Sequence, residues 1–302
     1  MATRLSTSRE CRDAYREVLQ GSTYVEEKDL FIKHFKEVDL GLIESKYKGC
    51  ARRAEKQGLS TKVQKLEFLQ EEDYWTEEEE QEYLVMSLAV KDAYIHAAKL
   101  HDAEQKKHFE ENIIKEQESK LQEIVKERSA LLEPTIEGYC EKQLNEFYVY
   151  HALYKDQELK TPFFSQEEFD ELSFIELADL ISLYNKETSK FSEKNIKIIA
   201  VNPWFLNSFF MCDDDPVKFF GKNVLDLTMY QMNLFSRGKF YKSVLIEGKE
   251  PPEQYFEEDA QNGLELAADW YNSAANSINA EREAARARSK SSSRGSTTVR
   301  RG

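Results

Sequence analysis

Apolar residues along this chain recur at intervals of three and four, which places them on one face of an α-helix. The segment after Ser165 is an example, with Phe169, Leu172 and Leu180 in helical register. Only 11 Gly and 6 Pro occur in 302 residues, whereas a sheet protein needs a turn after every strand. The sequence therefore predicts an all-α, multi-helix protein.

Helix boundaries are marked by residues that cap helices. Three pairs have the spacing of a capping box, in which two side chains satisfy free N–H groups at a helix start: Thr76 with Glu79, Ser165 with Glu168, and Thr228 with Gln231. Gly58 is placed to end a helix, and Pro203 is predicted to split residues 192–212 into two short helices. Residues 30–35 fit either a helix or a short extended piece.

No Gly or Pro occurs between Thr76 and Pro134. The apolar positions of this segment form two blocks, separated by the polar stretch "HDAEQKKH". This pattern predicts one long helix or a helical hairpin that packs on a partner. We predict an N-terminal helical region at 1–75, the long helix or hairpin at 76–133, a C-terminal globular helical domain at 134–280, and a disordered basic tail at 289–302.

The net charge of −14 makes the chain a poor ligand for nucleic acid, because it repels phosphates. The C-terminal tail differs, since Arg294, Arg300 and Arg301 stand there among Ser, Gly and Thr. We therefore expect nucleic acid binding, if any, only through this basic tail.

Membrane insertion and secretion are not expected from this sequence. No apolar run approaches the roughly 18 residues that a membrane-spanning helix needs, and the first residues lack the apolar block of a signal peptide. The four cysteines, Cys11, Cys50, Cys140 and Cys212, lie far apart and form no C-x-x-C pair. We expect them to be reduced thiols of a cytoplasmic protein.

Asp213, Asp214 and Asp215 are the first candidate for a metal site. A calcium loop needs alternating ligands, a Gly midway and a closing Glu, and Gly221 stands at the wrong offset for this. The alternative is a helix start, with Asp215 as the cap, Pro216 at the first helical position and Gly221 at the end. Gly238 is then predicted to end or kink the following helix. We expect structure rather than metal binding here.

His101, Glu104 and His108 are the second candidate, because a helix would place them on one face. A zinc or di-iron site usually has Glu-x-x-His or His-x-x-x-His spacing, and neither occurs in this stretch. The sequence also lacks phosphate-loop, dinucleotide-binding and nucleophile-elbow motifs. We expect no cofactor, no metal and no catalytic residue.

Aromatic residues concentrate between 203 and 245. Some must form a core, and those left exposed would be natural anchors for a partner. The predicted partner-binding residues are Trp204, Phe205, Phe209, Phe219, Phe220, Tyr230, Phe235 and Tyr241.

Five phrases together resemble tail-assembly or baseplate-hub assembly chaperones of contractile-tailed bacteriophages. In order they are "IKHFKEVD", "GLSTKVQKLEFLQEEDYWTEEEEQE", "YCEKQLNEFYVYHALYKDQEL", "FFSQEEFDELSFIELADLI" and "FFGKNVLDLTMYQMNLFSRGKFYKSVL". The resemblance covers about residues 24–260 and has no catalytic signature. It implies a non-enzymatic protein of the host cytoplasm that binds other tail or baseplate proteins during assembly. The alternatives are a structural component of the virion and a metal-dependent enzyme.

Overall fold

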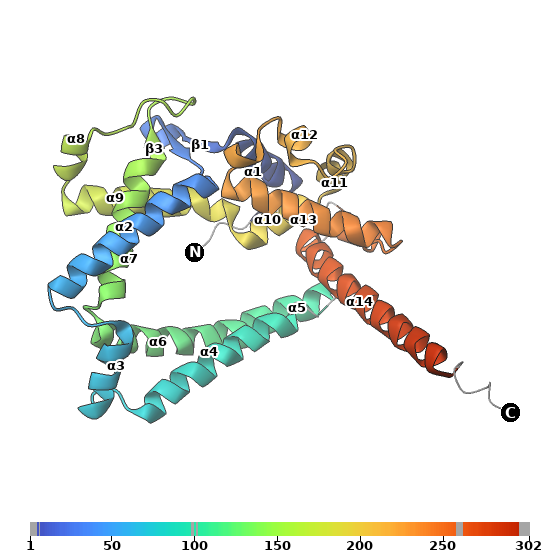
Figure 1. Ribbon diagram of the computed structural model, residues 1–302, viewed down its shortest axis with the longest axis horizontal. Helices are drawn as coiled ribbons and strands as arrows, with labels where there is room; N and C mark the ends of the chain where they lie inside the picture. Colours follow the sequence, from blue (N-terminus) through green and yellow to red (C-terminus); the bar gives the residue numbers. More distant parts are fainter. Residues whose placement is uncertain (1–4, 6, 98–99, 101, 258–261, 296–302) are drawn as a thin grey trace.

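The computed structural model describes residues 5, 7–97, 100, 102–257 and 262–295. It confirms a mostly helical protein, to which a small three-stranded antiparallel sheet is added. Figure 1 shows two parts. We call residues 62–132 the arm and the rest of the described chain the body.

The first part of the body combines helices with a hairpin of strands. Its elements are α1 (Ser8–Gln20), β1 (Ser22–Val25), η1 (Glu26–Lys28), β2 (Leu30–Lys33) and α2 (Glu37–Lys56). β1 pairs with β2, with Thr23 opposite Ile32. Of the two alternatives for residues 30–35, the extended piece is therefore correct, because Leu30 and Ile32 alternate into the core while their neighbours face outward.

The arm is a helical hairpin packed on a short helix. Its elements are α3 (Lys62–Glu71), α4 (Glu77–Ala97), α5 (Ala103–Phe109), the π-helical turn η2 (Glu110–Ile114) and α6 (Lys115–Leu132). Of the two alternatives for 76–133, the hairpin is correct and the single long helix is wrong. The reversal needs no Gly or Pro, because the Asp102 side chain accepts a hydrogen bond from Gln105 N at 2.7 Å and so starts α5.

The remaining body elements follow the arm in the chain. They are α7 (Ile136–Ala152), β3 (Leu153–Tyr154), α8 (Gln166–Asp170), α9 (Phe174–Thr188), η3 (Ser189–Phe191), α10 (Glu193–Val201), α11 (Pro203–Phe210), α12 (Pro216–Phe220), η4 (Val224–Asp226), α13 (Met229–Ile246), η5 (Glu253–Phe256) and α14 (Gly263–Gly295). β3 completes the sheet beside β2. The split of residues 192–212 at Pro203 is confirmed.

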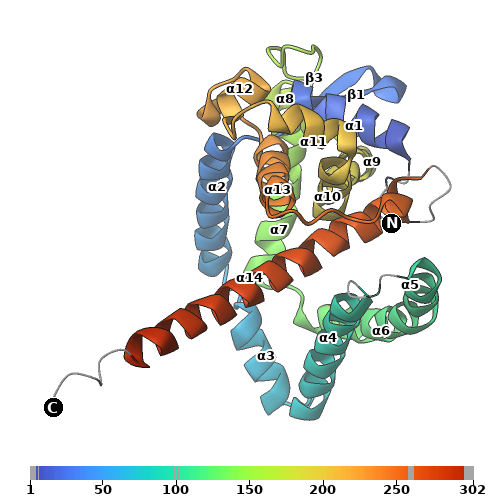
Figure 2. The ribbon, with the colours of Figure 1, turned by 90° about the vertical axis from the view of Figure 1, so that its right-hand side faces the viewer.

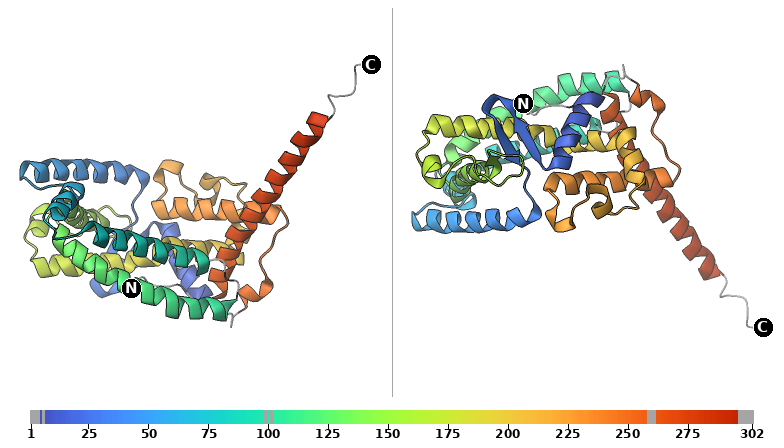
Figure 3. Two further views of the ribbon diagram at one scale, coloured as in Figure 1. Left: turned by 90° about the horizontal axis from the view of Figure 1, so that it is seen from below. Right: turned by 90° about the horizontal axis from the view of Figure 1, so that it is seen from above.

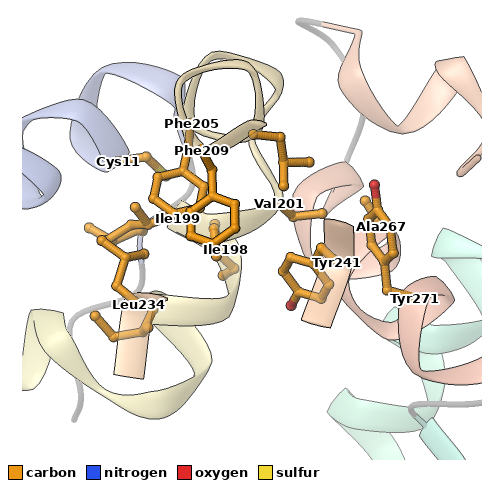
Figure 4. Packing of buried hydrophobic residues seen from close by; sticks show 14 of the residues in the cluster. Cys11, Ile198, Ile199, Val201, Phe205, Phe209, Leu234, Tyr241, Ala267 and Tyr271 are labelled. Carbon is orange, nitrogen blue, oxygen red and sulfur yellow. The ribbon is translucent and has the colours of Figure 1, made fainter. Parts of the chain in front are cut away.

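Two hydrophobic cores hold the body together. The larger one joins α1 to α10, α11, α13 and α14, and it contains Cys11, Ile199 and Leu234 (Figure 4). The second joins the sheet to α7 and α9 through Ile32 and Val149 among others. Both cores therefore contain residues from 1–75 and from 134–280, and of the predicted N-terminal region only α3 packs in the arm. The predicted domain limits stay a prediction.

The C-terminal part of the last helix, α14, projects away from the body (Figures 2 and 3). Its first turns contribute Leu266 and Tyr271 to the larger core. The helix continues to Gly295, so residues 289–295 of the predicted disordered tail have helical backbone. Residues 296–302 lie outside the described residues.

Candidate protein-binding site

A groove of about 990 Å³ lies between α7 and α9. We call it the α7–α9 groove. Its lining residues are Lys142, Asn145, Glu146, Phe174, Leu177, Ala178, Ile181, Ser182, Asn185, Lys186 and Ser189. The apolar side chains among them all come from α9, which makes one side of the groove apolar and leaves polar groups around it.

Local sequence explains why α9 lines this groove. The Ser173 hydroxyl caps the helix by accepting from Glu176 N at 3.3 Å, and the Glu176 carboxylate in turn accepts from Ser173 N at 2.8 Å. Leu180 and Leu183 then face the core of the body. A second apolar stripe on the same helix lines the groove instead, and its first residue, Phe174, is 85% exposed.

Polar groups on the edges of the groove carry both signs of charge. On α7, Lys142 bonds Glu133 at 3.1 Å, and Glu146 accepts from Gln143 at 3.0 Å. On α9, Lys186 lies 3.9 Å from Glu187. An apolar floor between polar edges is the arrangement that binds the apolar face of an amphipathic helix.

The predicted partner-binding aromatics occupy a different region. Phe205, Phe209, Phe235 and Tyr241 are buried in the larger core. Their rings contact one another and their neighbours, with Phe209 and Phe235 centroids 5.0 Å apart. A partner has no access to these four side chains in this conformation, because the helices that share the larger core, α14 among them, pack around them.

The other four predicted residues, Trp204, Phe219, Phe220 and Tyr230, are half-buried and pack against the same core. Trp204 donates its indole N–H to Asn202 at 3.1 Å, which fixes the ring. The structure thus brings the eight residues together, and their main role is to form the larger core of the body or to pack against it.

Gly238 explains how closely these rings pack. It lies inside α13, which continues to Ile246, so the prediction that Gly238 ends the helix is wrong. A Cβ at this position would stand 2.7 Å from Phe209 Cδ2. The residue is glycine because the Phe209 and Phe205 rings lie directly against the helix backbone.

Exposed apolar residues border this aromatic region. They include Met211, Leu225, Phe210 and Val217. Met211 is 85% and Leu225 is 76% exposed. We call these four residues the apolar margin, and exposed apolar side chains of this kind are candidates for contact with a partner.

The three aspartates at 213–215 make ordinary structural contacts. Asp215 caps α12 by accepting from Val217 N at 2.9 Å, and Gly221 ends the helix in the left-handed conformation, both as predicted. Asp213 accepts from Lys218 at 3.0 Å, and this hydrogen bond lowers the pKa of Asp213. Asp214 pairs with Lys242 at 2.8 Å.

Among the described residues, no group of three or more His, Cys, Asp or Glu side chains is placed to hold a metal ion. Of the second candidate metal site, His101 lies outside the described residues. Glu104 and His108 are exposed on α5.

Burial disfavours the thiolate form of three of the four cysteines. Burial raises the pKa of Cys11 to about 11 and also raises the pKa values of Cys140 and Cys212. A thiol attacks as its thiolate, so these groups are poor nucleophiles.

Comparisons with protein-family models, with curated proteins and with solved structures found no match. In the part of the chain that the structure describes, no helix is both long and apolar enough to span a membrane. The α7–α9 groove was missed in the sequence, although a signal existed. α9 carries two apolar stripes, whereas a helix that packs on the body with a single face needs one apolar stripe.

Proposed function

We propose that this chain is a non-enzymatic assembly protein of a contractile-tailed bacteriophage. It binds another tail or baseplate protein in the host cytoplasm while the tail or baseplate is built. The five phrases that resemble assembly chaperones support the biological setting. The α7–α9 groove supports the mode of action, which is binding without chemistry.

The observation that carries this proposal is the exposure of Phe174 beside the groove. A monomer that keeps an 85% exposed phenylalanine next to an open apolar groove leaves a large apolar area in contact with water. Covering that area is favourable at about 25 cal/mol per Å². An amphipathic helix of the partner would place its apolar side chains against Leu177, Ala178 and Ile181.

Affinity capture from infected cells tests this proposal. The tagged chain is expressed during infection by the phage that encodes it, and the captured proteins are identified by mass spectrometry. We expect a tail or baseplate protein at a fixed ratio to the chain. Capture of no phage protein by the folded wild-type chain would contradict the proposal.

Two variants locate the binding surface. Ala178→Arg fills the groove from an exposed position, so we expect capture to fall at least tenfold while the circular dichroism spectrum stays unchanged. Val63→Arg changes an exposed apolar residue on α3 and serves as the matched control, with capture unchanged. If instead Met211→Glu abolishes capture and Ala178→Arg does not, the apolar margin is the binding surface.

A structural component of the virion is the second candidate, because a permanent contact in the particle would cover the same apolar groove. Mass spectrometry of purified particles separates the two functions. An assembly protein is absent from finished particles, whereas a component is present at fixed copy number. The third candidate, a metal-dependent enzyme, would require stoichiometric metal in the purified protein.

A further inference from the structure

A buried ion pair joins the tip of the arm to the body. Lys106 on α5 is only 4% exposed, and its Nζ lies 2.5 Å from Asp269 Oδ2 on α14. A buried charge is costly unless it is paired. Removing either partner would therefore leave the other charge without a partner in the closed contact, which favours separation of α5 from α14.

The arm does not share its apolar packing with the body. Its two hydrophobic clusters are centred on Trp75 and Leu132 near the base, and on Ala97 and Ile114 near the tip. All described members of both clusters belong to the arm. The cores of the body, in turn, contain no described residue of the arm. Each part can keep its core while the other moves.

The contact at the tip is not close-packed. An open cleft of about 480 Å³ lies at the joint, between arm residues such as Tyr94 and body residues such as Ile198 and Ala268. Side chains that interlocked across the joint would fill this space. The Lys106–Asp269 ion pair is therefore the contact whose loss we expect to free the tip of the arm.

The base of the arm has the features of a hinge. The chain enters the arm through Gly58, which has a φ of +83°, and the Ser60 carbonyl accepts from Ile136 N at 3.0 Å. Lys62 N donates to Glu137 Oε2 at 2.8 Å. A few backbone residues between rigid helices are where domain hinges absorb rotation.

We propose that the arm is a hinged clamp, held closed against the body by the Lys106–Asp269 ion pair. Rotation about residues 57–61 and 133–135 opens it and separates α5 from α14. The two cores of the body and the two clusters of the arm stay intact in both positions. This clamp does not depend on which protein occupies the α7–α9 groove.

Electron paramagnetic resonance distance measurements on the full chain test the clamp. Spin labels are attached at Asp92→Cys on the arm and Asn207→Cys on the body, both exposed positions, in a Cys212→Ser background because the other cysteines are buried. The parent protein should give one narrow distance distribution. Asp269→Asn should add a population at longer distance, with an unchanged circular dichroism spectrum.

Two further variants complete the test. Lys106→Met removes the charge but fills the same space, and it should give the same second population. Glu44→Gln breaks the exposed Lys48–Glu44 pair and should leave the distribution narrow. A narrow distribution in either Asp269→Asn or Lys106→Met would overturn the proposal, as would loss of body structure in both.

Discussion

The body and the arm are both helical, but they are stabilised by different means. In the body, segments far apart in sequence pack aromatic rings together, as when the ring centroids of Tyr15 of α1 and Phe205 of α11 lie 5.8 Å apart. In the arm, two small apolar clusters join the helices, and polar contacts between α4 and α6 add to them. Glu80 accepts from Arg128 at 2.8 and 2.9 Å and from the Trp75 indole at 2.9 Å.

This difference indicates which part of the molecule opens locally. Apolar burial between distant segments makes the body one cooperative unit. The arm has small apolar clusters and many exposed backbone hydrogen bonds, which are the features of regions that open locally at low free energy. The predictions below test this contrast, beginning with the largest effect.

Phe209→Ala should be the most damaging of these changes, because the ring is fully buried against Gly238 and Phe235. Removing a buried Phe costs about 3–5 kcal/mol. We expect the midpoint of urea unfolding of the body to fall accordingly, as measured by near-ultraviolet circular dichroism. A loss below about 1 kcal/mol would contradict the role of the aromatic core.

Glu80→Gln should loosen the arm and leave the body unchanged. The substitution weakens the paired bond from Arg128, and hydrogen bonds to charged groups are worth about 1.5–3 kcal/mol. Trypsin should then cleave within residues 62–132 about tenfold faster or more. Cleavage within the body is the internal control, and an equal increase there would show that the two parts unfold together.

The burial of neutral His34 should make the body less stable at acidic pH. The difference in free energy of unfolding between body and arm should then become smaller. Burial, together with the positive charges of Lys190 and Lys222, lowers the pKa of His34 to about 3. The Thr23 hydroxyl lies 2.9 Å from His34 Nε2, and the rings of Phe191 and Tyr230 pack against the imidazole. The unfolded chain binds a proton near pH 6.5 and the folded body does not. Stability of the body is therefore full above pH 6.5 and falls by about 1.4 kcal/mol for each pH unit below it.

Urea titrations of the wild type and of His34→Gln between pH 7 and pH 5 measure this effect. The variant should have lower stability at pH 7 and a flatter dependence on pH. A remaining slope is expected from His151, whose pKa burial also lowers. Equal slopes in the two proteins would show that His34 is not kept neutral by burial.

Asp213→Asn combined with Asp214→Asn should have the smallest effect. Both residues have positive φ, at 50° and 58°, and asparagine adopts this conformation as readily as aspartate. The Asp213–Lys218 pair is exposed, whereas Lys242 beside Asp214 is only 13% exposed. Asparagine can still accept a hydrogen bond from Lys242, so we expect a change within about 1 kcal/mol. Melting temperatures with and without Mg²⁺, Ca²⁺ and Zn²⁺ check this, and a metal-dependent shift only in the wild type would revive the carboxylate site.

Local signals predicted much of the fold. The capping boxes at Thr76, Ser165 and Thr228 are all present, because a cap is formed by residues three apart. Contacts between distant segments were not predictable in the same way. Nothing within α1 indicates that Val18 packs in a core with α10 and α13, and four-residue strands are too short to show a period.

The candidate site was predicted less well than the fold, for a related reason. Aromatic density between 203 and 245 indicated apolar contact, but periodicity does not say whether a ring such as Phe209 meets the core or a partner. Gly238 was misread for the same reason, since the ring that requires it lies on another helix. The groove residues on α9 were visible only as a second stripe beside Leu180 and Leu183.

Native-state hydrogen exchange, followed by mass spectrometry at pH 7, tests the central contrast most directly. We expect amides of α4 and α6 in the arm to exchange together through a partial opening of low free energy. Amides of α10 and α13 in the body should exchange last, at the free energy of global unfolding. Equal free energies of exchange for the four helices would contradict the account, because arm and body would then be one cooperative unit.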